Sequence, residues 1–187
     1  MITEEMLREI APFAPKNAEV FVPYLNKFMP LFGINTQKRI AAFLAQLAHE
    51  SGSFRYVREI ASGSAYEGRI DLGNTFKGDG KLFKGRGLIQ ITGRSNYRAC
   101  SLALFGDLRL LEQPWILESP QYAVAAACWF WQSRGLNEIA DQPDNKIYTR
   151  KGIRYKTFEW ITLKINGGLT HYKEREQFWI KAKKALS

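Results

Sequence analysis

A glycine-rich segment at residues 62–87 interrupts an otherwise helical sequence and is the main constraint on the fold. Seven of the fifteen glycines fall within these 26 residues. A compact domain seldom carries so long an irregular segment unless the segment is functional. The sequence therefore predicts helices on both sides of an irregular functional region. Little or no β structure is expected beyond a short strand pairing near Phe76–Phe83.

Helix start and stop residues define the first two expected helices. Thr3 is expected to cap a helix that ends before Pro12. Asn17 is expected to cap a second helix that reaches Phe32, and Pro23 should bend that helix or delay its start.

The third expected helix contains the first candidate for chemistry. It begins at Asn35 or Thr36 and ends at Gly52, and His49 and Glu50 occupy its last turn. Glu50 falls at the edge of an apolar stripe, where partial burial would favour the protonated carboxyl that a general acid needs. The stripe, spaced at i, i+3, i+4 and i+7, consists of Ile40, Phe43, Leu44 and Leu47.

Four more helices are expected after the glycine-rich segment. Ser119 followed by Pro120, with Gly135 as the stop, is a strong start–stop pattern. The tetrapeptide Ile165-Asn166-Gly167-Gly168 predicts a tight turn. The helices are expected from Ser95 or Asn96 to Gly106, from Ser119 to Gly135, and over Lys156–Lys164 and His171–Leu186. The face expected in the core comprises Tyr122, Ala125, Ala126, Trp129 and Phe130.

The composition is that of one folded domain spanning residues 1–187. Of its residues, 45% are hydrophobic and 24% are charged, and no apolar run approaches the ~20 residues of a membrane helix. The acidic start, Met1-Ile2-Thr3-Glu4-Glu5, lacks the basic and apolar regions of a signal peptide. Cys100 and Cys128 lie in apolar helical stretches, so two buried thiols are expected rather than a disulfide or a metal site.

The net charge of +9, from 27 Lys and Arg against 18 Asp and Glu, favours polyanionic partners. Nucleic acid and an anionic bacterial envelope both fit this charge. Nucleic-acid binding is not expected, because no recognition motif is present and the cations are scattered. The one exception to that scatter is the group Lys181, Lys183 and Lys184.

Several catalytic chemistries are excluded by residues that the chain lacks. The pair His49-Glu50 looks like the start of a zinc-protease helix, but Ser53 occupies the position of the second histidine. The chain has two histidines in all, so a histidine-rich metal site is excluded, and no cofactor is expected. Phosphate-loop, dinucleotide-binding and serine-hydrolase motifs are also missing.

A pair of carboxylates remains. Glu50 ends a helix, and Glu59 follows nine residues later, just before the glycine-rich segment. Such an arrangement lets the second carboxyl face the first across a groove. Glycoside hydrolysis needs one protonated acid for the leaving oxygen and one carboxylate for the second step. Taken alone, the spacing is weak support, since glutamates nine residues apart are common.

Three short segments of the chain are informative because of their residues and their order. Residues 48–54 read Ala-His-Glu-Ser-Gly-Ser-Phe, residues 85–97 read GRGLIQITGRSNY, and residues 165–168 read Ile-Asn-Gly-Gly. They resemble the H-E-[ST]-x-x-[FW], G-R-G-x-[IL]-Q-[IL]-[ST]-x-x-x-N-Y and I-N-G-G motifs of glycoside hydrolase family 19, the chitinase-like lysozyme group. The resemblance spans about residues 35–175. The compact size and the short gap between Glu50 and Glu59 look most like the phage and prophage endolysins of this family.

The resemblance implies a mainly α, lysozyme-like helical fold with a substrate groove between a larger and a smaller lobe. Glu50 would be the general acid and Glu59 the general base of an inverting mechanism, with Glu67 as the alternative base. Their carboxyls would stand ~6.5–9.5 Å apart to leave room for water, and Thr92 would hold that water. Candidates for substrate binding, or for organising the surroundings of the acid, are His49, Arg86, Gln90, Asn96, Tyr97 and Asn166.

The resemblance also implies a partner and a place of action. The expected substrate is the β-1,4-linked amino-sugar strand of bacterial peptidoglycan. The alternatives are a chitinase acting on N-acetylglucosamine polymers and a non-catalytic module that binds the cell wall. The protein is expected to act as a monomer without membrane insertion. It would be made in the bacterial cytoplasm and reach the wall by holin-dependent release.

Overall fold

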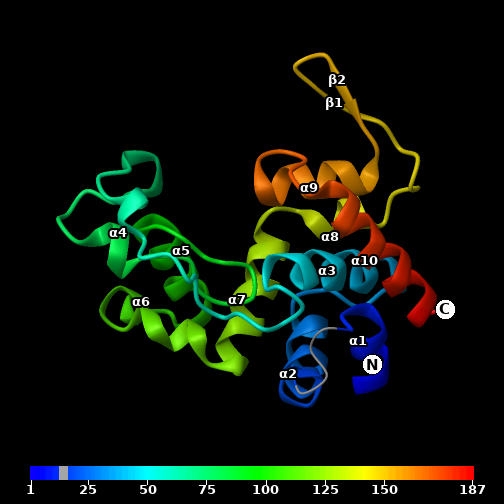
Figure 1. Cartoon of the computed structure of the whole chain (residues 1–187), viewed down its shortest axis with the longest axis horizontal. Coiled ribbons are helices and arrows are strands. Elements are labelled where there is room, and N and C mark those ends of the chain that lie inside the picture. Colours follow the sequence, from blue (N-terminus) through cyan, green and yellow to red (C-terminus); the bar gives the residue numbers. More distant parts are fainter. Residues whose placement is uncertain (13–16) are drawn as a thin grey trace.

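The molecule has a larger and a smaller lobe, in agreement with the expected lysozyme-like helical fold (Figure 1). The computed structural model describes residues 1–12 and 17–187. Helix α7 (Pro120–Ser133) contacts both α2 and α5 and so joins the two lobes. The other helices of the larger lobe are α1 (Glu4–Ile10), α2 (Asn17–Leu31), α3 (Gln37–Glu50), α8 (Leu136–Ala140), α9 (Thr157–Asn166) and α10 (Tyr172–Ala185).

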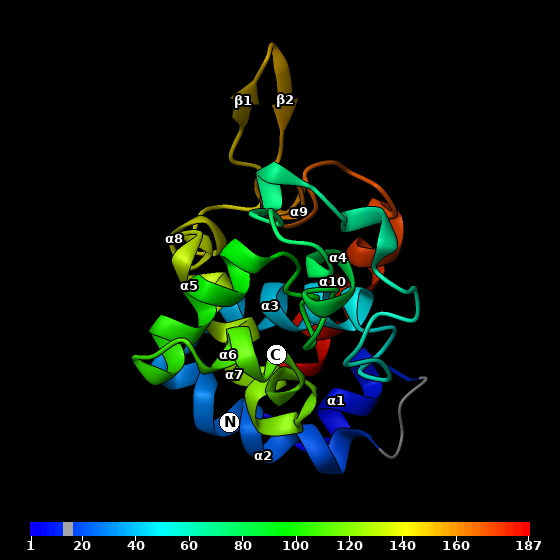
Figure 2. The ribbon, with the colours of Figure 1, turned by 90° about the vertical axis from the view of Figure 1, so that its left-hand side faces the viewer.

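The smaller lobe is built from short elements of the middle of the chain (Figure 2). They are the 3₁₀ turns η1 (Ser64–Tyr66), η2 (Ile70–Leu72) and η3 (Pro114–Glu118), and the helices α4 (Asp79–Leu82), α5 (Arg94–Phe105) and α6 (Arg109–Glu112). An antiparallel hairpin of β1 (Tyr148–Arg150) and β2 (Ile153–Tyr155) stands clear of the body between α8 and α9 (Figures 1 and 2).

Side-chain caps fix two of the predicted helix starts. The Thr3 hydroxyl accepts a hydrogen bond from the Met6 amide (3.2 Å), and the Thr36 hydroxyl accepts one from the Arg39 amide (3.3 Å). Each bond satisfies an amide that the first helical turn leaves without a partner.

Helix α2 differs from its prediction. Asn17 is its first residue, and its side-chain amide donates to the carbonyl oxygen of Phe54 (2.7 Å). The helix also continues through Pro23, so this proline does not delay its start. The Asn17 side chain thus makes a contact with a residue 37 positions away in the chain.

Helix α3 is the central helix of the larger lobe. Every residue from 41 to 48 is buried, because α10 packs along this helix and α1 and α8 contact it as well. Phe43 packs edge-on against Trp131 of α7, with ring centroids 5.4 Å apart. A helix that is buried all round is fixed in position by its neighbours. Glu50, at its carboxyl end, is therefore supported directly by the core.

The predicted strand pairing near Phe76–Phe83 is wrong, and this segment contains α4 instead. Asp79 is the physical reason: its carboxylate accepts a hydrogen bond from the Phe76 amide (3.1 Å) and pairs with Arg94 (2.6 Å). These contacts curl the chain at the point where a strand would have to stay extended.

Cys100 and Cys128 are buried free thiols, as predicted. Burial raises the pKa of the Cys100 thiol to about 12 and also raises that of Cys128. Neither thiol is therefore suited to act as a nucleophile. Among the described residues, no helix has the length and apolar character needed to cross a membrane.

Replacing Leu44 with Ala should lower the free energy of unfolding by about 2–5 kcal/mol, because the cavity would form in a fully packed helix. Leu44 is 0% exposed. Chemical denaturation followed by circular dichroism measures the change. Leu31→Ala is the control: Leu31 is 70% exposed, and the change there should stay within about 0.5 kcal/mol. Equal effects at both positions would contradict the central place of α3.

Candidate active site

A cleft of about 230 Å³ lies between the two lobes. Five residues that the sequence singled out share it: Glu50, Gln90, Thr92, Asn96 and Asn166. The wall from the larger lobe consists of Glu50, Phe130, Arg134, Ile165 and Asn166, and the wall from the smaller lobe consists of Leu72, Ile89, Gln90, Ile91, Thr92 and Asn96.

Glu50 is the last residue of α3, and its side chain is 18% exposed. Its buried Oε1 forms an ion pair with Nη2 of Arg175 on α10 (2.6 Å). Arg175 is 2% exposed and also donates from Nη1 to Oε1 of Gln46, one turn back on α3 (2.6 Å). The guanidinium therefore holds Oε1 inside the protein and leaves Oε2 as the oxygen available to the cleft.

His49 precedes Glu50, but its ring faces α10. Its Nδ1 lies 2.8 Å from a carboxylate oxygen of Glu174, and its ring centroid is 5.6 Å from that of His171. Burial lowers the pKa of His49, and the positive charge of Arg175 lowers it further. The carboxylates of Glu50 and Glu174 raise this pKa but do not outweigh the two lowering effects. His49 thus belongs to the surroundings of the Glu50–Arg175 pair and does not line the cleft.

The chain reverses direction directly after Glu50. Residues 52–54 have positive φ angles of 57°, 63° and 61°, a conformation that persists only where the surroundings enforce it. The Ser51 hydroxyl supplies part of that enforcement, because it donates to the Leu47 carbonyl oxygen (2.6 Å) and accepts from the Phe54 amide (2.7 Å). This anchored turn carries the chain from Glu50 toward the second carboxylate.

The opposite wall of the cleft is a tight loop within residues 85–93. Arg86 and Ile91 exchange two backbone hydrogen bonds, of 3.1 and 2.8 Å. The turn between them requires a positive φ of 56° at Gln90. Ile91 is buried, and the residues on either side of it, Gln90 and Thr92, line the cleft.

The polar groups of this loop are already hydrogen-bonded to one another. The Thr92 hydroxyl donates to the Gln90 carbonyl oxygen (2.9 Å), and the Asn96 amide donates to the Thr92 carbonyl oxygen (2.7 Å). The Gln90 amide donates to the Gly87 carbonyl oxygen (2.9 Å). Hydroxyl and amide oxygens keep their lone pairs in this arrangement. The loop can therefore accept hydrogen bonds from a water or from sugar hydroxyls.

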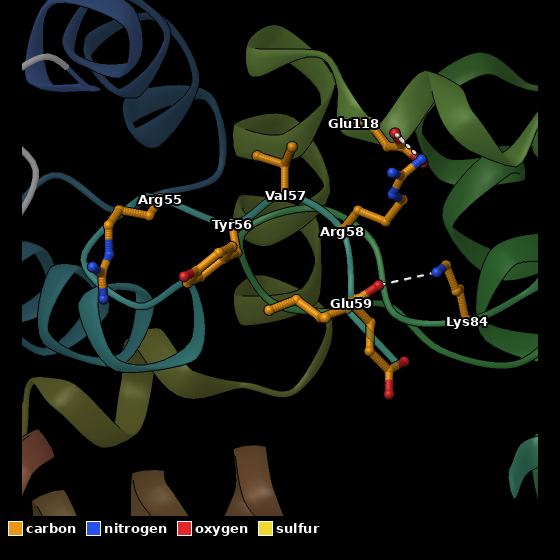
Figure 3. Close-up of a pocket in the computed structure, with 8 residues that line it drawn as sticks. Arg55, Tyr56, Val57, Arg58, Glu59, Lys84 and Glu118 are labelled. Atoms are coloured by element: carbon orange, nitrogen blue, oxygen red, sulfur yellow. Dashed lines mark hydrogen bonds and ion pairs between the residues drawn. The ribbon is translucent and has the colours of Figure 1, made fainter. Parts of the chain in front are cut away.

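Glu59 lines a separate hollow of about 460 Å³ (Figure 3). Its carboxylate accepts hydrogen bonds from the Tyr66 hydroxyl (3.0 Å) and the Gly85 amide (3.0 Å). In Figure 3 the carboxylate points away from Lys84, whose ammonium donates instead to the Glu59 carbonyl oxygen (3.0 Å). Within the described part of the chain, both hydrogen-bond partners of this carboxylate are neutral donors and none is a cation.

Gly85 connects Glu59 with the cleft. A Cβ atom on Gly85 would lie 3.2 Å from Oε2 of Glu59 and 2.6 Å from Oε1 of Gln90. Both side chains therefore converge on this glycine, and Gln90 in turn shares the cleft with Glu50. The expected separation of ~6.5–9.5 Å between the carboxyls of Glu50 and Glu59 stays a prediction.

Glu67, the alternative base, has a structural contact. Its carboxylate oxygens accept hydrogen bonds from the amides of Gly78 (2.6 Å) and Gly80 (2.8 Å), and these bonds lower the pKa of Glu67. It lines neither the cleft nor the hollow around Glu59. Glu67 therefore links the two sides of the glycine-rich segment, and Glu59 stays the predicted base.

Arg86 and Tyr97, expected among the substrate-binding residues, are not placed in the cleft. Tyr97 is 0% exposed, and its hydroxyl donates to the Lys84 carbonyl oxygen (2.7 Å). Arg86 donates to that hydroxyl (3.0 Å) and pairs with Glu118 (2.8 Å). Burial keeps both side chains from a sugar, and their contacts hold the 85–93 loop in position.

Three residues of the site were missed by sequence reasoning. Arg175 lies on a buried face of α10 together with Phe178 and Ala182, at i, i+3 and i+7. A charged residue at an apolar position of this helical pattern could have identified Arg175 from the sequence. Phe130, expected in the core, is only partly buried and lines the cleft. Arg134 lies beside it, with its guanidinium 3.6 Å from the ring centroid.

A helical two-lobed fold has one ion-paired carboxyl in the cleft and a second carboxyl in a hollow that Gly85 links to the cleft wall. Two carboxyls on such a fold agree with the organisation of a glycoside hydrolase. Residues 31–177 match the family model of glycoside hydrolase family 19, described as chitinase class I. The chain therefore belongs to glycoside hydrolase family 19, a family of chitinase-type O-glycosyl hydrolases.

Relatives agree with this membership. An endochitinase of Arabidopsis thaliana is 36% identical over 151 residues, which are 80% of this chain and 46% of that protein. The chain thus spans less than half the length of this plant relative. A glycosyl hydrolase family 19 domain-containing protein of Haemophilus influenzae is 28% identical over 206 residues, covering 94% of this chain and 92% of that one.

A solved structure has the same fold. The crystal structure of chitinase C from Streptomyces griseus superposes with a TM-score of 0.67 over 99% of this chain and 92% of that chain, at 21% identity.

Gly85→Ala should lower the rate of hydrolysis by at least about tenfold while the protein stays folded. The added methyl would displace Gln90 and Glu59 together, and misplacing catalytic groups by about 1 Å can cost on the order of 10²-fold. Steady-state hydrolysis of N-acetylglucosamine oligosaccharides, with circular dichroism as the folding check, measures this. Gly168→Ala is the matched control, because its Cβ would meet open space. Full activity of Gly85→Ala would show that catalysis does not depend on the close approach of Glu59 and Gln90 to Gly85.

Proposed function

We propose that the protein hydrolyses β-1,4 linkages of N-acetylglucosamine-containing glycans by acid–base catalysis with inversion. The observation that carries this proposal is the Arg175–Glu50 ion pair, which fixes one carboxyl oxygen in the core at the wall of the cleft. Because Arg175 holds Oε1, a proton taken up by Glu50 would be carried on Oε2 and passed from there to the glycosidic oxygen. Glu59 would take a proton from the attacking water on the other side of the sugar.

The polar residues of the cleft would position the water and the sugar. The hydroxyl of Thr92 can turn from the Gln90 carbonyl oxygen to the attacking water. Gln90, Asn96 and Asn166 line the same cleft, and their side-chain amides both donate and accept hydrogen bonds. Amides of this kind suit the acetamido and hydroxyl groups of an N-acetylated sugar.

The names of the relatives support chitin-type oligosaccharides as the substrate. The plant relatives are endochitinases, and the superposed bacterial structure is that of a chitinase. Cleavage of a β-1,4 bond next to N-acetylglucosamine is the chemistry that this substrate needs.

A second candidate substrate is the glycan strand of peptidoglycan, which contains the same sugar. The net charge of +9 favours this candidate, because an anionic envelope attracts a basic enzyme. The short gap of eight residues between Glu50 and Glu59, which resembles that of endolysins, also favours this candidate.

Purified protein incubated with each substrate distinguishes the two candidates. Mass spectrometry of the products should show shortened N-acetylglucosamine oligomers, released peptidoglycan fragments, or both. In peptidoglycan fragments, a reducing-end muramic acid identifies a muramidase, whereas a reducing-end glucosamine identifies a glucosaminidase. No cleavage of either substrate by folded protein would refute the proposal.

Glu50→Gln should reduce hydrolysis by at least about 100-fold without unfolding, because it removes the proton donor and keeps the shape of the side chain. The rate is measured on whichever substrate the wild type cleaves. Glu112→Gln, a change at an exposed glutamate on α6, is the control and should keep full activity. Near-normal hydrolysis by Glu50→Gln would show that Glu50 is not the general acid.

A further inference from the structure

A second hollow, of about 440 Å³, continues the cleft toward the β1–β2 hairpin. Arg134 lines both spaces. Asn166 of the cleft is followed in the chain by Gly167, which lines the hollow. A glycan strand that leaves the catalytic cleft at this end would pass directly over the hollow. The residues that line it are Arg134, Arg150, Trp160, Leu163, Lys164 and Gly167.

The charges of this hollow are of one sign. It contains three cations and no acidic residue. Within residues 1–12 and 17–187, neither Arg134, Arg150 nor Lys164 has a carboxylate partner, whereas Arg39, Arg94 and Arg175 are all paired. Partial burial lowers the pKa of Arg134. A desolvated guanidinium without a counter-ion is unfavourable, and a bound anion would relieve this cost.

The hollow is held in shape by the base of the hairpin. Tyr148 of β1 stacks on Trp160 of α9, with ring centroids 5.3 Å apart and planes 2° from parallel. Its strand partner Tyr155 packs against the same indole at 5.8 Å. The hairpin closes through Lys151 and Gly152, both with positive φ (51° and 77°), which is the geometry of a tight two-residue turn. Arg150 is thereby positioned at the rim of the hollow.

We infer that this hollow is an additional subsite that binds the carboxylate-bearing peptide stem of a peptidoglycan strand held in the cleft. The inference rests on the proposed glycosidase function and selects the second candidate substrate. A neutral N-acetylglucosamine polymer offers no carboxylate to these three cations. A stem peptide ends in carboxylates that Arg134, Arg150 and Lys164 can pair with, and its apolar methyl groups can contact Trp160 and Leu163.

The test compares two double variants that remove the same charge. Arg150→Gln/Lys164→Gln alters the hollow, and Lys181→Gln/Lys184→Gln alters exposed lysines on α10 that line neither space. Each is assayed on soluble peptidoglycan strands that carry stems and on a neutral N-acetylglucosamine hexamer. The first variant should raise KM for the stem-bearing strands by about 5- to 10-fold with kcat retained, the scale of two exposed ionic contacts. The hexamer, and the control variant, should show no change.

Binding without turnover separates this inference from the proposed function. Calorimetric titration of Glu50→Gln protein with a stem-bearing disaccharide should show binding that weakens by about 5- to 10-fold when Arg150→Gln/Lys164→Gln is added. If the wild type cleaves nothing while this binding holds, the proposed function fails and the subsite stands. Equal KM values in the two double variants, an equal loss on the neutral hexamer, or competition by an oligonucleotide as strong as by stem peptide would overturn the subsite.

Discussion

Arg175 places a buried guanidinium between α10 and α3, where it contacts Glu50 and Gln46 at once. Gln46 extends this network to α9, because its amide donates to the Thr162 hydroxyl (2.9 Å). Glu50 stands at the carboxyl end of α3, where the helix dipole disfavours a negative charge, and the guanidinium offsets this. Removing one partner of a buried pair costs about 3–5 kcal/mol, so the network that orients the acid also holds three helices together.

The facing wall is ordered by backbone geometry together with the contacts of Arg86, including its ion pair with Glu118. The 85–93 loop depends on a left-handed Gln90, on the missing Cβ of Gly85, and on the buried contact between Arg86 and Tyr97. The acid on one lobe and the polar loop on the other are therefore each held by their own contacts on either side of the cleft.

Much of the fold and part of the site could be predicted from local patterns. The caps at Thr3 and Thr36 and the Ser119-Pro120 helix start act over a few residues, and periodicity revealed the apolar face that ends at Glu50. The grouping of Gln90, Thr92 and Asn96 followed from one contiguous motif.

The parts that could not be predicted depend on distant contacts. Arg175 lies 125 positions from Glu50 in the chain, and Asn17 bonds to Phe54. Asp79 curls its segment because Arg94 lies opposite. The hairpin at 148–155 was missed because its strands are short and its stability comes from stacking on Trp160. Burial of Tyr97 is likewise a tertiary property that a motif does not reveal.

The central claim is that Glu50 and Glu59 act together across one bound sugar. A crystal structure of Glu50→Gln protein with an oligosaccharide spanning the cleft tests it most directly. The residue-50 amide should lie within hydrogen-bond distance of the glycosidic oxygen, and Glu59 and Thr92 should hold a water on the opposite face of the ring. The side-chain carbons of residues 50 and 59 should be ~6.5–9.5 Å apart. A Glu59 carboxylate turned away from the sugar, with Glu67 or no carboxylate near the water, would contradict it.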